Sequence, residues 1–175
     1  MKETFYRPGP EALAEVLAFY GRLIDGMRDA PYRPGWEKGV YPSEEFLASS
    51  LERGELTVLR ADGVPAGAMV VNHSCTDGYE TAAWGIRAEP EEVSVIHALG
   101  VSPDFQGRGL AAALVREAVR LSRRGGQKAV RLDVLKGNIP ARRLYTAAGF
   151  QYRGTVRFFY EDTGLTDFLL YELVL

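Results

Sequence analysis

The feature of this sequence that most constrains its fold is a strand–helix–strand unit over residues 94–135. Residues 94–101 are apolar almost throughout, which predicts a buried central strand, and apolar side chains recur at helical spacing over residues 107–124. Two glycines at 125–126 end that helix, and residues 128–135 then alternate as a second strand. Such a unit predicts an α/β or α+β fold with a mixed sheet.

Further strands and helices are expected on both sides of this unit. The expected strands cover residues 4–7, 56–61, 66–72, 79–86, 151–160 and 167–175, and the expected helices cover residues 11–26, 43–53 and 140–148. Asp62 and Gly63 lie between two of these strands and are typical of a hairpin turn. Ser43 is expected to cap the helix that follows it.

Length and composition exclude several classes of protein. The chain has 175 residues, the usual size of one domain, and we expect residues 1–175 to form a single domain. The chain has one cysteine, Cys75, so it cannot form an internal disulfide. One cysteine and two histidines are too few ligands for a usual zinc site, so no metal is expected. No apolar run approaches the roughly 20 residues of a membrane helix, and the N-terminus lacks the apolar stretch of a secretory signal. We therefore expect a cytoplasmic protein that does not bind membranes.

Charge is distributed unevenly along the chain. The formal net charge is −2, which argues against general affinity for nucleic acid. Residues 108–143 hold ten Lys and Arg against two acids, a balance of +8, whereas residues 1–104 hold nine basic and seventeen acidic residues, a balance of −8. This distribution favours an anionic ligand beside the basic region and a cationic substrate beside the acidic one. The alternative for any single charge is a solvated helix face.

The turn at residues 106–111 joins the expected central strand to the long helix and contains two glycines. Glycines let the backbone approach a ligand closely, and the first turn of a helix leaves N–H groups free to bind an anion. The turn contains neither G-x-x-x-x-G-K-[ST] nor G-x-G-x-x-G, so two familiar nucleotide-binding motifs do not apply. It therefore predicts a phosphate-binding turn, and the alternative is a tight turn without a ligand.

Two linked motifs resemble the GNAT N-acetyltransferase superfamily. Gln106, Gly109 and Ala111 fit its Q/R-x-x-G-x-G/A signature. The next strand and helix carry the family's second pattern in the right order, as Leu132-Asp133-Val134, Asn138, Ala141, Leu144-Tyr145 and Gly149-Phe150. The resemblance covers about residues 94–150. It implies a mixed, mostly antiparallel central sheet of about seven strands flanked by about four helices, and an enzyme that transfers the acetyl group of acetyl-CoA to a primary amine.

In this family, the turn and the splayed end of the central strand hold the cofactor. The resemblance implies that backbone N–H groups of the turn bind the diphosphate of acetyl-CoA and that the strand end binds the pantetheine arm. The implied cofactor-binding residues are Ala98, Leu99, Gly100, Val101, Gln106, Gly107, Arg108, Gly109, Leu110, Ala111, Asn138, Ala141 and Arg143. Gly100 inside a strand is typical of a bulge or a close backbone approach. Asn138 has an alternative role as a helix cap ahead of Pro140.

Acetyl transfer to an amine needs a base, because a free alkyl amine has a pKa of about 10, and the leaving thiolate benefits from an acid. Tyr145 matches the family's tyrosine that serves as this acid, and its alternative is a packed aromatic residue. Many relatives carry a base glutamate on the central strand at the position where this chain has His97. His97 is therefore the candidate base, with Glu92, the acids of residues 1–55 and an ordered water as alternatives.

The strand periodicity leaves the orientation of His97 open. Simple alternation places His97, Leu99 and Val101 on one buried face, which would make His97 a core residue. A bulge at Leu99-Gly100 would change the face.

The acceptor amine is expected at the two places where the family varies most, about residues 28–42 and 158–168. Candidate acceptor-binding residues are Tyr32, Trp36, Tyr41 and Phe159. The alternative is that these aromatic side chains anchor polar loops on the core. The sequence does not name the amine, and a homodimer is expected only because dimers are common in the family.

Two other functions stay open at this point. The missing strand glutamate allows a regulatory module that binds CoA or acyl-CoA without catalysis. An acyltransferase that uses a longer acyl-CoA would carry the same motifs.

Overall fold

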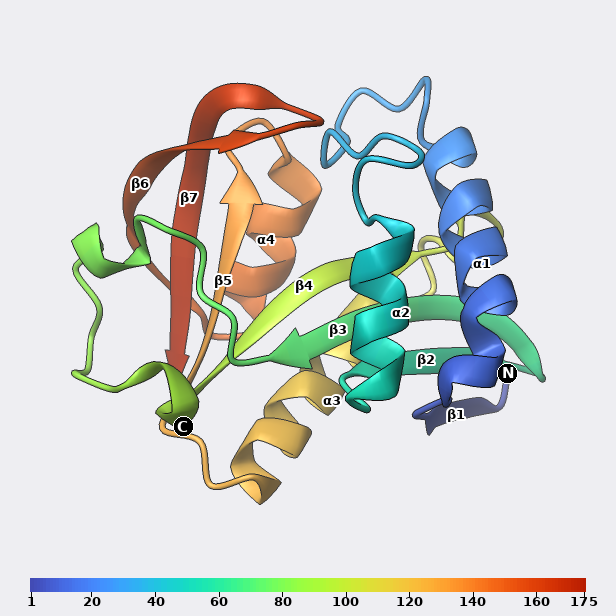
Figure 1. The fold of residues 1–175 in the computed structure, drawn as a ribbon, viewed down its shortest axis with the longest axis horizontal. Coiled ribbons are helices and arrows are strands. Elements are labelled where there is room, and N and C mark those ends of the chain that lie inside the picture. The colour runs from blue at the N-terminus through green and yellow to red at the C-terminus, as the bar shows by residue number, and fades with distance from the viewer.

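One seven-stranded sheet runs through the molecule in the order β1-β2-β3-β4-β5-β7-β6 (Figure 1). The computed structural model describes residues 1–175. The strands are β1 (Glu3–Tyr6), β2 (Leu56–Ala61), β3 (Val64–Asn72), β4 (Val93–Val101), β5 (Ala129–Leu135), β6 (Gln151–Tyr160) and β7 (Gly164–Val174), and the helices are α1 (Leu13–Gly26), α2 (Glu44–Glu52), α3 (Leu110–Arg124) and α4 (Ile139–Ala147). Neighbouring strands are antiparallel except β4 and β5, which are parallel and joined by α3. The predicted mixed, mostly antiparallel fold is confirmed.

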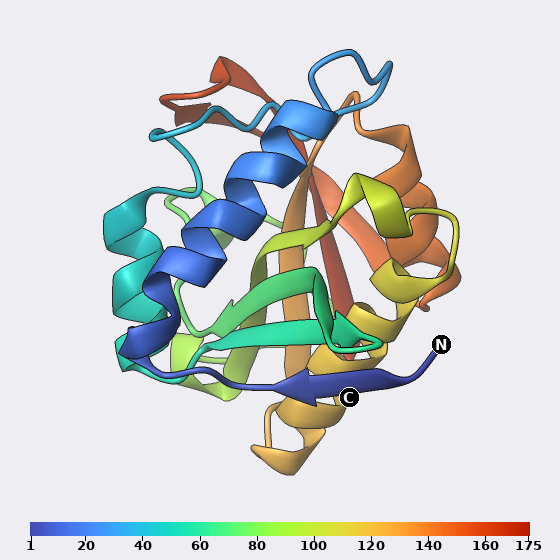
Figure 2. The same ribbon diagram turned by 90° about the vertical axis from the view of Figure 1, so that its right-hand side faces the viewer.

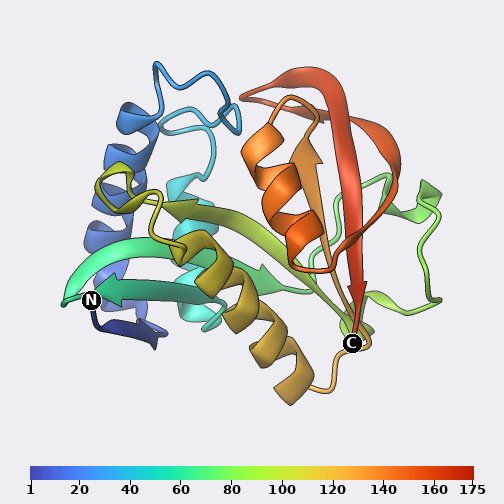
Figure 3. The same ribbon diagram turned by 180° about the vertical axis from the view of Figure 1, so that it is seen from behind.

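The helices form two layers, with α1 and α2 on one face of the sheet and α3 and α4 on the other (Figures 2 and 3). The apolar side of α3, including Leu110 and Leu114, packs with Tyr145 and Phe150 in one buried cluster. The apolar sides of α1 and α2 pack on β2 and β3 in a second cluster. No helix combines the length and the apolar character that crossing a bilayer requires.

Local signals place several element ends correctly. The Ser43 side chain accepts a hydrogen bond of 3.1 Å from the Phe46 N–H, so it caps α2 as predicted. Asp62 and Gly63 both have positive φ and form the turn between β2 and β3. The long helix begins at Leu110 and not at residue 107, because Gly107 and Gly109 adopt left-handed backbone angles that a helix does not allow.

The strand predicted over residues 79–86 is wrong. Residues 73–92 form a long connection between β3 and β4 that contains two short 3-10 turns, at Tyr79–Thr81 and Pro90–Glu92. The aromatic residues of this segment suggested a strand, but they pack against the sheet from outside it. Tyr79 is buried and packs against Trp84 and Phe158 in a third apolar cluster.

A bulge in β4 changes the face that its side chains occupy. Val70 of β3 pairs with His97 and Ala68 pairs with Gly100, so two residues of β4 lie opposite one residue of β3. Ala98 is in this bulge with a φ of 48°, and its carbonyl oxygen accepts a hydrogen bond of 2.7 Å from the Tyr20 hydroxyl of α1. A bulge at Leu99-Gly100 was one of the two alternatives for this strand, and the observed bulge lies one residue earlier.

The bulge also decides between the two orientations of His97 that the strand periodicity left open. Leu99 and Val101 pack against the cluster under α3, whereas His97 makes an edge contact with Phe46 of α2, with ring centroids 6.2 Å apart. His97 therefore does not share a face with Leu99 and Val101.

Strands β4 and β5 separate soon after they meet. They pair only from Val93–Val95 to Ala129–Arg131, although β4 continues to Val101 and β5 continues to Leu135. Figure 1 shows the two strands diverging toward the C-terminal end of β5. The remaining edges of both strands are left without a strand partner, and this opening defines the site.

Candidate active site

The turn before α3 presents a series of free backbone N–H groups. Gly107 and Gly109 have φ values of 73° and 79°, and the space beside both is open. None of the backbone N–H groups from Gly107 to Ala112 donates a hydrogen bond to another part of the chain, and no side chain caps the helix. Residues 106–109 are exposed and the first turn of α3 holds no acid. The arrangement suits an anion, because free N–H groups and the helix dipole both favour negative charge.

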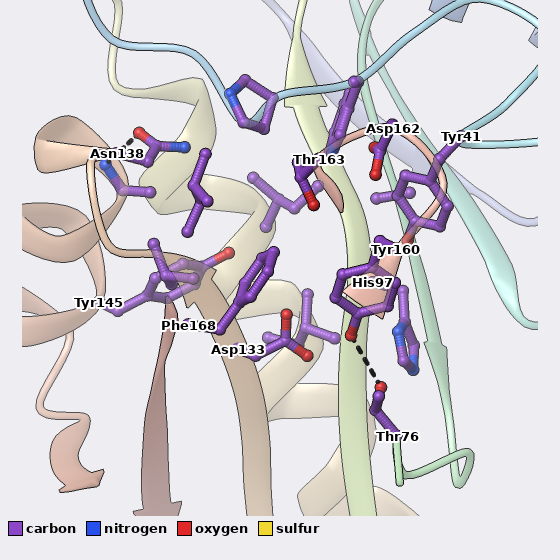
Figure 4. A pocket seen from close by; sticks show the side chains of 18 of the residues that line it. Tyr41, Thr76, His97, Asp133, Asn138, Tyr145, Tyr160, Asp162, Thr163 and Phe168 are labelled. Atoms are coloured by element: carbon purple, nitrogen blue, oxygen red, sulfur yellow. Dashed lines mark hydrogen bonds between the residues drawn. The ribbon is translucent and has the colours of Figure 1, made fainter. Parts of the chain in front are cut away.

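A cavity of about 260 Å³ fills the opening between β4 and β5 (Figure 4). Its walls come from several parts of the chain that are far apart in sequence. The lining residues include Trp36 and Tyr41 from the α1–α2 loop, Thr76 from the β3–β4 connection, His97, Ala98 and Leu99 from β4, Asp133 and Leu135 from β5, Asn138, Ala141 and Tyr145 from the start and body of α4, and Tyr160, Asp162 and Thr163 from the β6–β7 hairpin. Two of these walls meet at Gly35, which has no room for a side chain next to Thr163.

Asp133 is the carboxylate at the bottom of this cavity (Figure 4). Strand alternation places Val130, Leu132 and Val134 in the core under α3 and leaves Asp133 on the opposite face. Its Oδ2 accepts a hydrogen bond of 2.7 Å from the Tyr79 hydroxyl. Burial raises the pKa of Asp133 to about 6, against the opposing effect of the Tyr79 and Tyr160 hydroxyl groups. A carboxylate with this pKa can accept a proton near neutral pH.

His97 lies on the β4 side of the cavity. Its Nε2 lies 3.1 Å from the Ser74 carbonyl oxygen, so Nε2 carries the proton that it donates there. Burial lowers the pKa of His97 to about 4, which keeps the ring neutral and makes it a weaker base than Asp133 at neutral pH. His97 and Asp133 therefore face the same cavity with pKa values displaced in opposite directions.

Tyr145 projects from α4 into the cavity, with its hydroxyl group directed inward in Figure 4. Its ring packs edge-on against Phe150 at a centroid distance of 5.6 Å. Burial, followed by the charge of Asp133, raises the pKa of Tyr145 well above its usual value, so the hydroxyl stays protonated and available as a donor. The packed position and the inward hydroxyl are compatible with each other.

Asn138 and Ala141 connect the cavity to the start of α4. The Asn138 side chain accepts a hydrogen bond of 3.3 Å from the Ala141 N–H, so it caps the helix, and both residues also line the cavity. The cap was the alternative role for Asn138. Its amide nitrogen is left free by this bond.

The remaining predicted residues divide between the site and the surface. Ala98 and Leu99 line the cavity, while Gly100 lies beyond it, with Leu23 and Trp36 close enough that a side chain there would be tight. Val101 is half-buried under α3, and Arg143 is exposed on α4.

The aromatic residues expected around the acceptor also divide. Trp36 and Tyr41 line the cavity and contact each other edge-on, with centroids 6.0 Å apart. Tyr32 and Phe159 lie outside it, with 51% and 69% of their surface exposed. Phe159 points away because β6 is an edge strand whose side chains alternate, and its neighbour Tyr160 takes the place in the cavity wall.

Asp133 and the hydroxyl groups around it were missed as functional residues. Asp133 was noted only as part of a motif and of a charge count. One signal was present, because residues 130, 132 and 134 are apolar and an acid between them must face the other side of the strand. No comparable signal marks Tyr79 or Thr76, since Tyr79 reaches Asp133, and Thr76 reaches Tyr160, only through the tertiary fold.

Comparisons with known proteins agree with this architecture. The family model described as "Acetyltransferase (GNAT) family" matches residues 23–150, which is more than half of the chain. The chain belongs to the GNAT acetyltransferase family. The resemblance drawn from the two linked motifs is thereby confirmed.

The curated relatives align with only part of this GNAT chain. An uncharacterised N-acetyltransferase of Methanocaldococcus jannaschii is 35% identical over 74 residues, which is 42% of this chain and 33% of the relative. The N-alpha-acetyltransferase RimI of Mycobacterium tuberculosis is 40% identical over 78 residues, which is 45% of this chain and 47% of the relative. The aligned stretches therefore span less than half of each of these relatives.

Solved structures match the fold over nearly the whole chain. A GNAT acetyltransferase from Listeria monocytogenes has a TM-score of 0.76 with 18% identity and covers 99% of this chain and 95% of its own. YncA of Salmonella typhimurium, a putative acetyltransferase solved with its cofactor acetyl-CoA, has a TM-score of 0.70 with 16% identity and covers 99% of this chain and 94% of its own. At these identities the likeness concerns the fold.

Proposed function

We propose that this protein transfers the acetyl group of acetyl-CoA to a primary amine by direct attack of the amine on the thioester. The observation that carries the proposal is the combination of free backbone N–H groups in the turn that follows β4 with a buried carboxylate in the opening between β4 and β5. One region suits an extended anionic cofactor, and the other suits an amine that must lose a proton. Membership of the GNAT family and the acetyl-CoA in the YncA structure support the choice of cofactor.

The residues present fit acetyl-CoA. The N–H groups from Gly107 to Ala112 would hold its diphosphate, and the open space beside Gly107 and Gly109 leaves room for the phosphate oxygens. The edge of β4 beyond Val95 has no strand partner, so its backbone groups are free to pair with the amide-bearing pantetheine arm. Asn138 has a free amide nitrogen at the side of the same opening. When bound, acetyl-CoA supplies an acetyl group activated as a thioester.

Asp133 would accept the proton of the attacking amine. An alkyl ammonium has a pKa of about 10 and must be deprotonated before its nitrogen can attack. Asp133 has a pKa of about 6, lines the cavity, and is ionised at neutral pH. We prefer it to His97 as the base because burial lowers the pKa of His97 to about 4.

Tyr145 would donate a proton to the departing sulfur. Its raised pKa keeps the hydroxyl protonated, and the hydroxyl faces the cavity from the α4 side. The protons balance as follows: the ammonium gives one proton to Asp133, which releases it to solvent, and the nitrogen gives a second proton to the Tyr145 phenolate as the amide forms, which restores the hydroxyl that protonated the thiolate. Trp36 and Tyr41 would form the apolar wall against which the body of the amine packs. The cytoplasmic location and the homodimer stay predictions.

The proposal is tested by measuring binding and turnover separately. Calorimetry with acetyl-CoA should show saturable binding, and thiol release across a panel of primary amines should show turnover that depends on the amine. Asp133→Asn should lower kcat by about 10²- to 10⁴-fold without weakening acetyl-CoA binding. Asp62→Asn, at the distant β2–β3 turn, is the matched control and should behave as the wild type. Binding without turnover on any amine would contradict the enzyme and favour a sensing module.

A further inference from the structure

The connection between β3 and β4 supports the cavity at three points. The Ser74 carbonyl oxygen accepts the hydrogen bond of His97, and Thr76 Oγ1 shares a hydrogen bond of 3.0 Å with the Tyr160 hydroxyl (Figure 4). Tyr79 donates its 2.7 Å hydrogen bond to Asp133. Three residues of this segment thus contact three different titratable side chains of the site, each on a different strand.

Tyr79 is fixed in place independently of Asp133. Its side chain is only 3% exposed, and its ring stacks on Phe158 and lies against Trp84. The Trp84 indole N–H donates a hydrogen bond of 2.7 Å to the Tyr79 carbonyl oxygen. A rigid donor of this kind can impose one orientation on a flexible carboxylate.

The far end of the same segment is tied to the sheet. The Gly85 N–H donates a hydrogen bond of 2.6 Å to Glu172 of β7, and there is no room for a side chain at Gly85. Arg131 pairs with Glu172 at 3.1 Å, packs its guanidinium over Trp84, and donates a hydrogen bond to the Ile86 carbonyl oxygen. These contacts hold the segment against β5, the strand that carries Asp133.

We propose that Tyr79 is the positioning residue of the reaction, and that its hydroxyl holds Oδ2 of Asp133 so that the other carboxylate oxygen receives the proton of the amine. This inference rests on the proposed function, because it assigns Tyr79 a role through Asp133. Tyr79 does not line the cavity, so it acts on the substrate only through that carboxylate. Burial and the neighbouring Asp133 hold the pKa of Tyr79 well above 10, so it remains a donor across the neutral range.

Several other groups face Asp133 and must be separated from the effect of Tyr79. The Tyr160 hydroxyl of β6, which is hydrogen-bonded to Thr76, also lowers the pKa of the carboxylate. The charge of Asp133 contributes to raising the pKa of the Tyr145 hydroxyl on α4 and of the Tyr41 hydroxyl on the α1–α2 loop. His97 of β4 and Asp162 of the β6–β7 turn line the same cavity. None of these other groups is hydrogen-bonded to the Tyr79 hydroxyl, so its removal breaks one hydrogen bond of this network.

The test is Tyr79→Phe, which keeps the ring and its packing. Loss of a hydrogen bond to the ionised form raises the pKa of Asp133, so the acidic limb of the kcat/KM profile should move up by about one pH unit. Activity on the acidic side should fall about tenfold and recover at alkaline pH. The Kd for acetyl-CoA should not change. Tyr152→Phe is the matched control, because the exposed Tyr152 hydroxyl bonds only to Thr155.

A second variant keeps the hydrogen bond to Asp133 and should move the acidic limb in the opposite direction. Replacement of Tyr79 by 3-fluorotyrosine acidifies the phenol, strengthens its hydrogen bond, and should move the acidic limb to lower pH. An equal loss of activity at every pH in Tyr79→Phe, or a further loss when it is added to Asp133→Asn, would overturn the proposal, because either result describes a purely structural residue.

Direct titration of Asp133 separates this inference from the proposed function. Carboxyl-carbon NMR follows the pKa of Asp133 without any substrate, and it should be higher in Tyr79→Phe than in the wild type. An unmoved pKa overturns the inference even if the protein is an active acetyltransferase. A raised pKa in a protein whose Asp133→Asn variant keeps full turnover supports the Tyr79 contact and contradicts the proposed base.

Discussion

The two ends of the candidate site, the turn before α3 and the cavity around Asp133, are built in different ways. The end at the turn before α3 consists of backbone N–H groups from consecutive residues, and the side chains there contribute little. The end at Asp133 consists of side chains from strands, loops and a helix that are far apart in sequence. The backbone end needs only a local conformation, whereas the side-chain end needs the whole fold. A change at the first should therefore affect cofactor binding alone, and a change at the second should affect proton transfer alone.

The largest effect is expected at the backbone end. Gly109→Trp should abolish measurable acetyl-CoA binding, because a large side chain would fill the open space beside the free N–H groups and would strain a residue with a φ of 79°. Calorimetry measures this loss. The matched control is Gly63→Trp at the β2–β3 turn, which also has a positive φ and open space. Equal losses in both variants would show that backbone strain, and not a blocked site, is responsible.

The next largest effect is expected at the side-chain end, where a substitution should lower turnover without weakening cofactor binding. Tyr145→Phe should lower kcat by about 10²- to 10⁴-fold and leave the Kd for acetyl-CoA unchanged, because only the proton donated to the sulfur is lost. Thiol release under saturating acetyl-CoA measures kcat, with Tyr152→Phe as the control. Unchanged turnover would show that Tyr145 serves only to pack against Phe150 and that the thiolate leaves without a proton donor.

The same contrast explains what the sequence could predict. The turn at residues 106–111, the cap at Ser43 and the parallel crossover through α3 all depend on local signals, and the structure contains each of them. The segment at residues 79–86 misled the prediction, because its aromatic residues pack sideways into a cluster formed with β6 and β7. A local pattern of apolar residues does not distinguish side chains that pack in this way from side chains on the buried face of a strand.

The β4 bulge shows a subtler limit of the sequence. Gly100 suggested a bulge, but the residue with left-handed backbone angles is Ala98, whose carbonyl is held by Tyr20 from a helix 78 residues away in sequence. Whether His97 faces the cavity depends on that long-range bond. The identities of Asp133 and Tyr145 were visible in the motif, whereas the hydroxyl groups that surround Asp133 depend on the tertiary fold.

A smaller effect is expected on stability, because burying the ionised Asp133 carboxylate lowers the free energy of unfolding. The pKa of Asp133 rises from 3.8 to about 6 on folding, so the folded state binds more protons than the unfolded state between about pH 4 and 6. The free energy of unfolding therefore falls as the pH rises through this window. Asp133→Asn removes this cost and should raise the Tm by about 3–10 °C at pH 7.5, with little change at pH 4. Thermal scans at the two pH values measure it, with Asp62→Asn as the control. A lower Tm at pH 7.5 would contradict the buried charge.

The smallest effect is expected at His97, on the side of the cavity where the family pattern predicted the base. Its pKa falls from 6.5 to about 4 on folding, so the unfolded state binds more protons over this window and stability is lost as the pH falls through it. His97→Gln removes that loss and should raise the Tm by a few degrees at pH 5 but not at pH 8. The acidic limb of the kcat/KM profile should stay in place, because Asp133 sets it. A limb that moves with His97→Gln and not with Asp133→Asn would instead make His97 the base, and the bulge at Ala98 would then be the feature that turns it toward the amine.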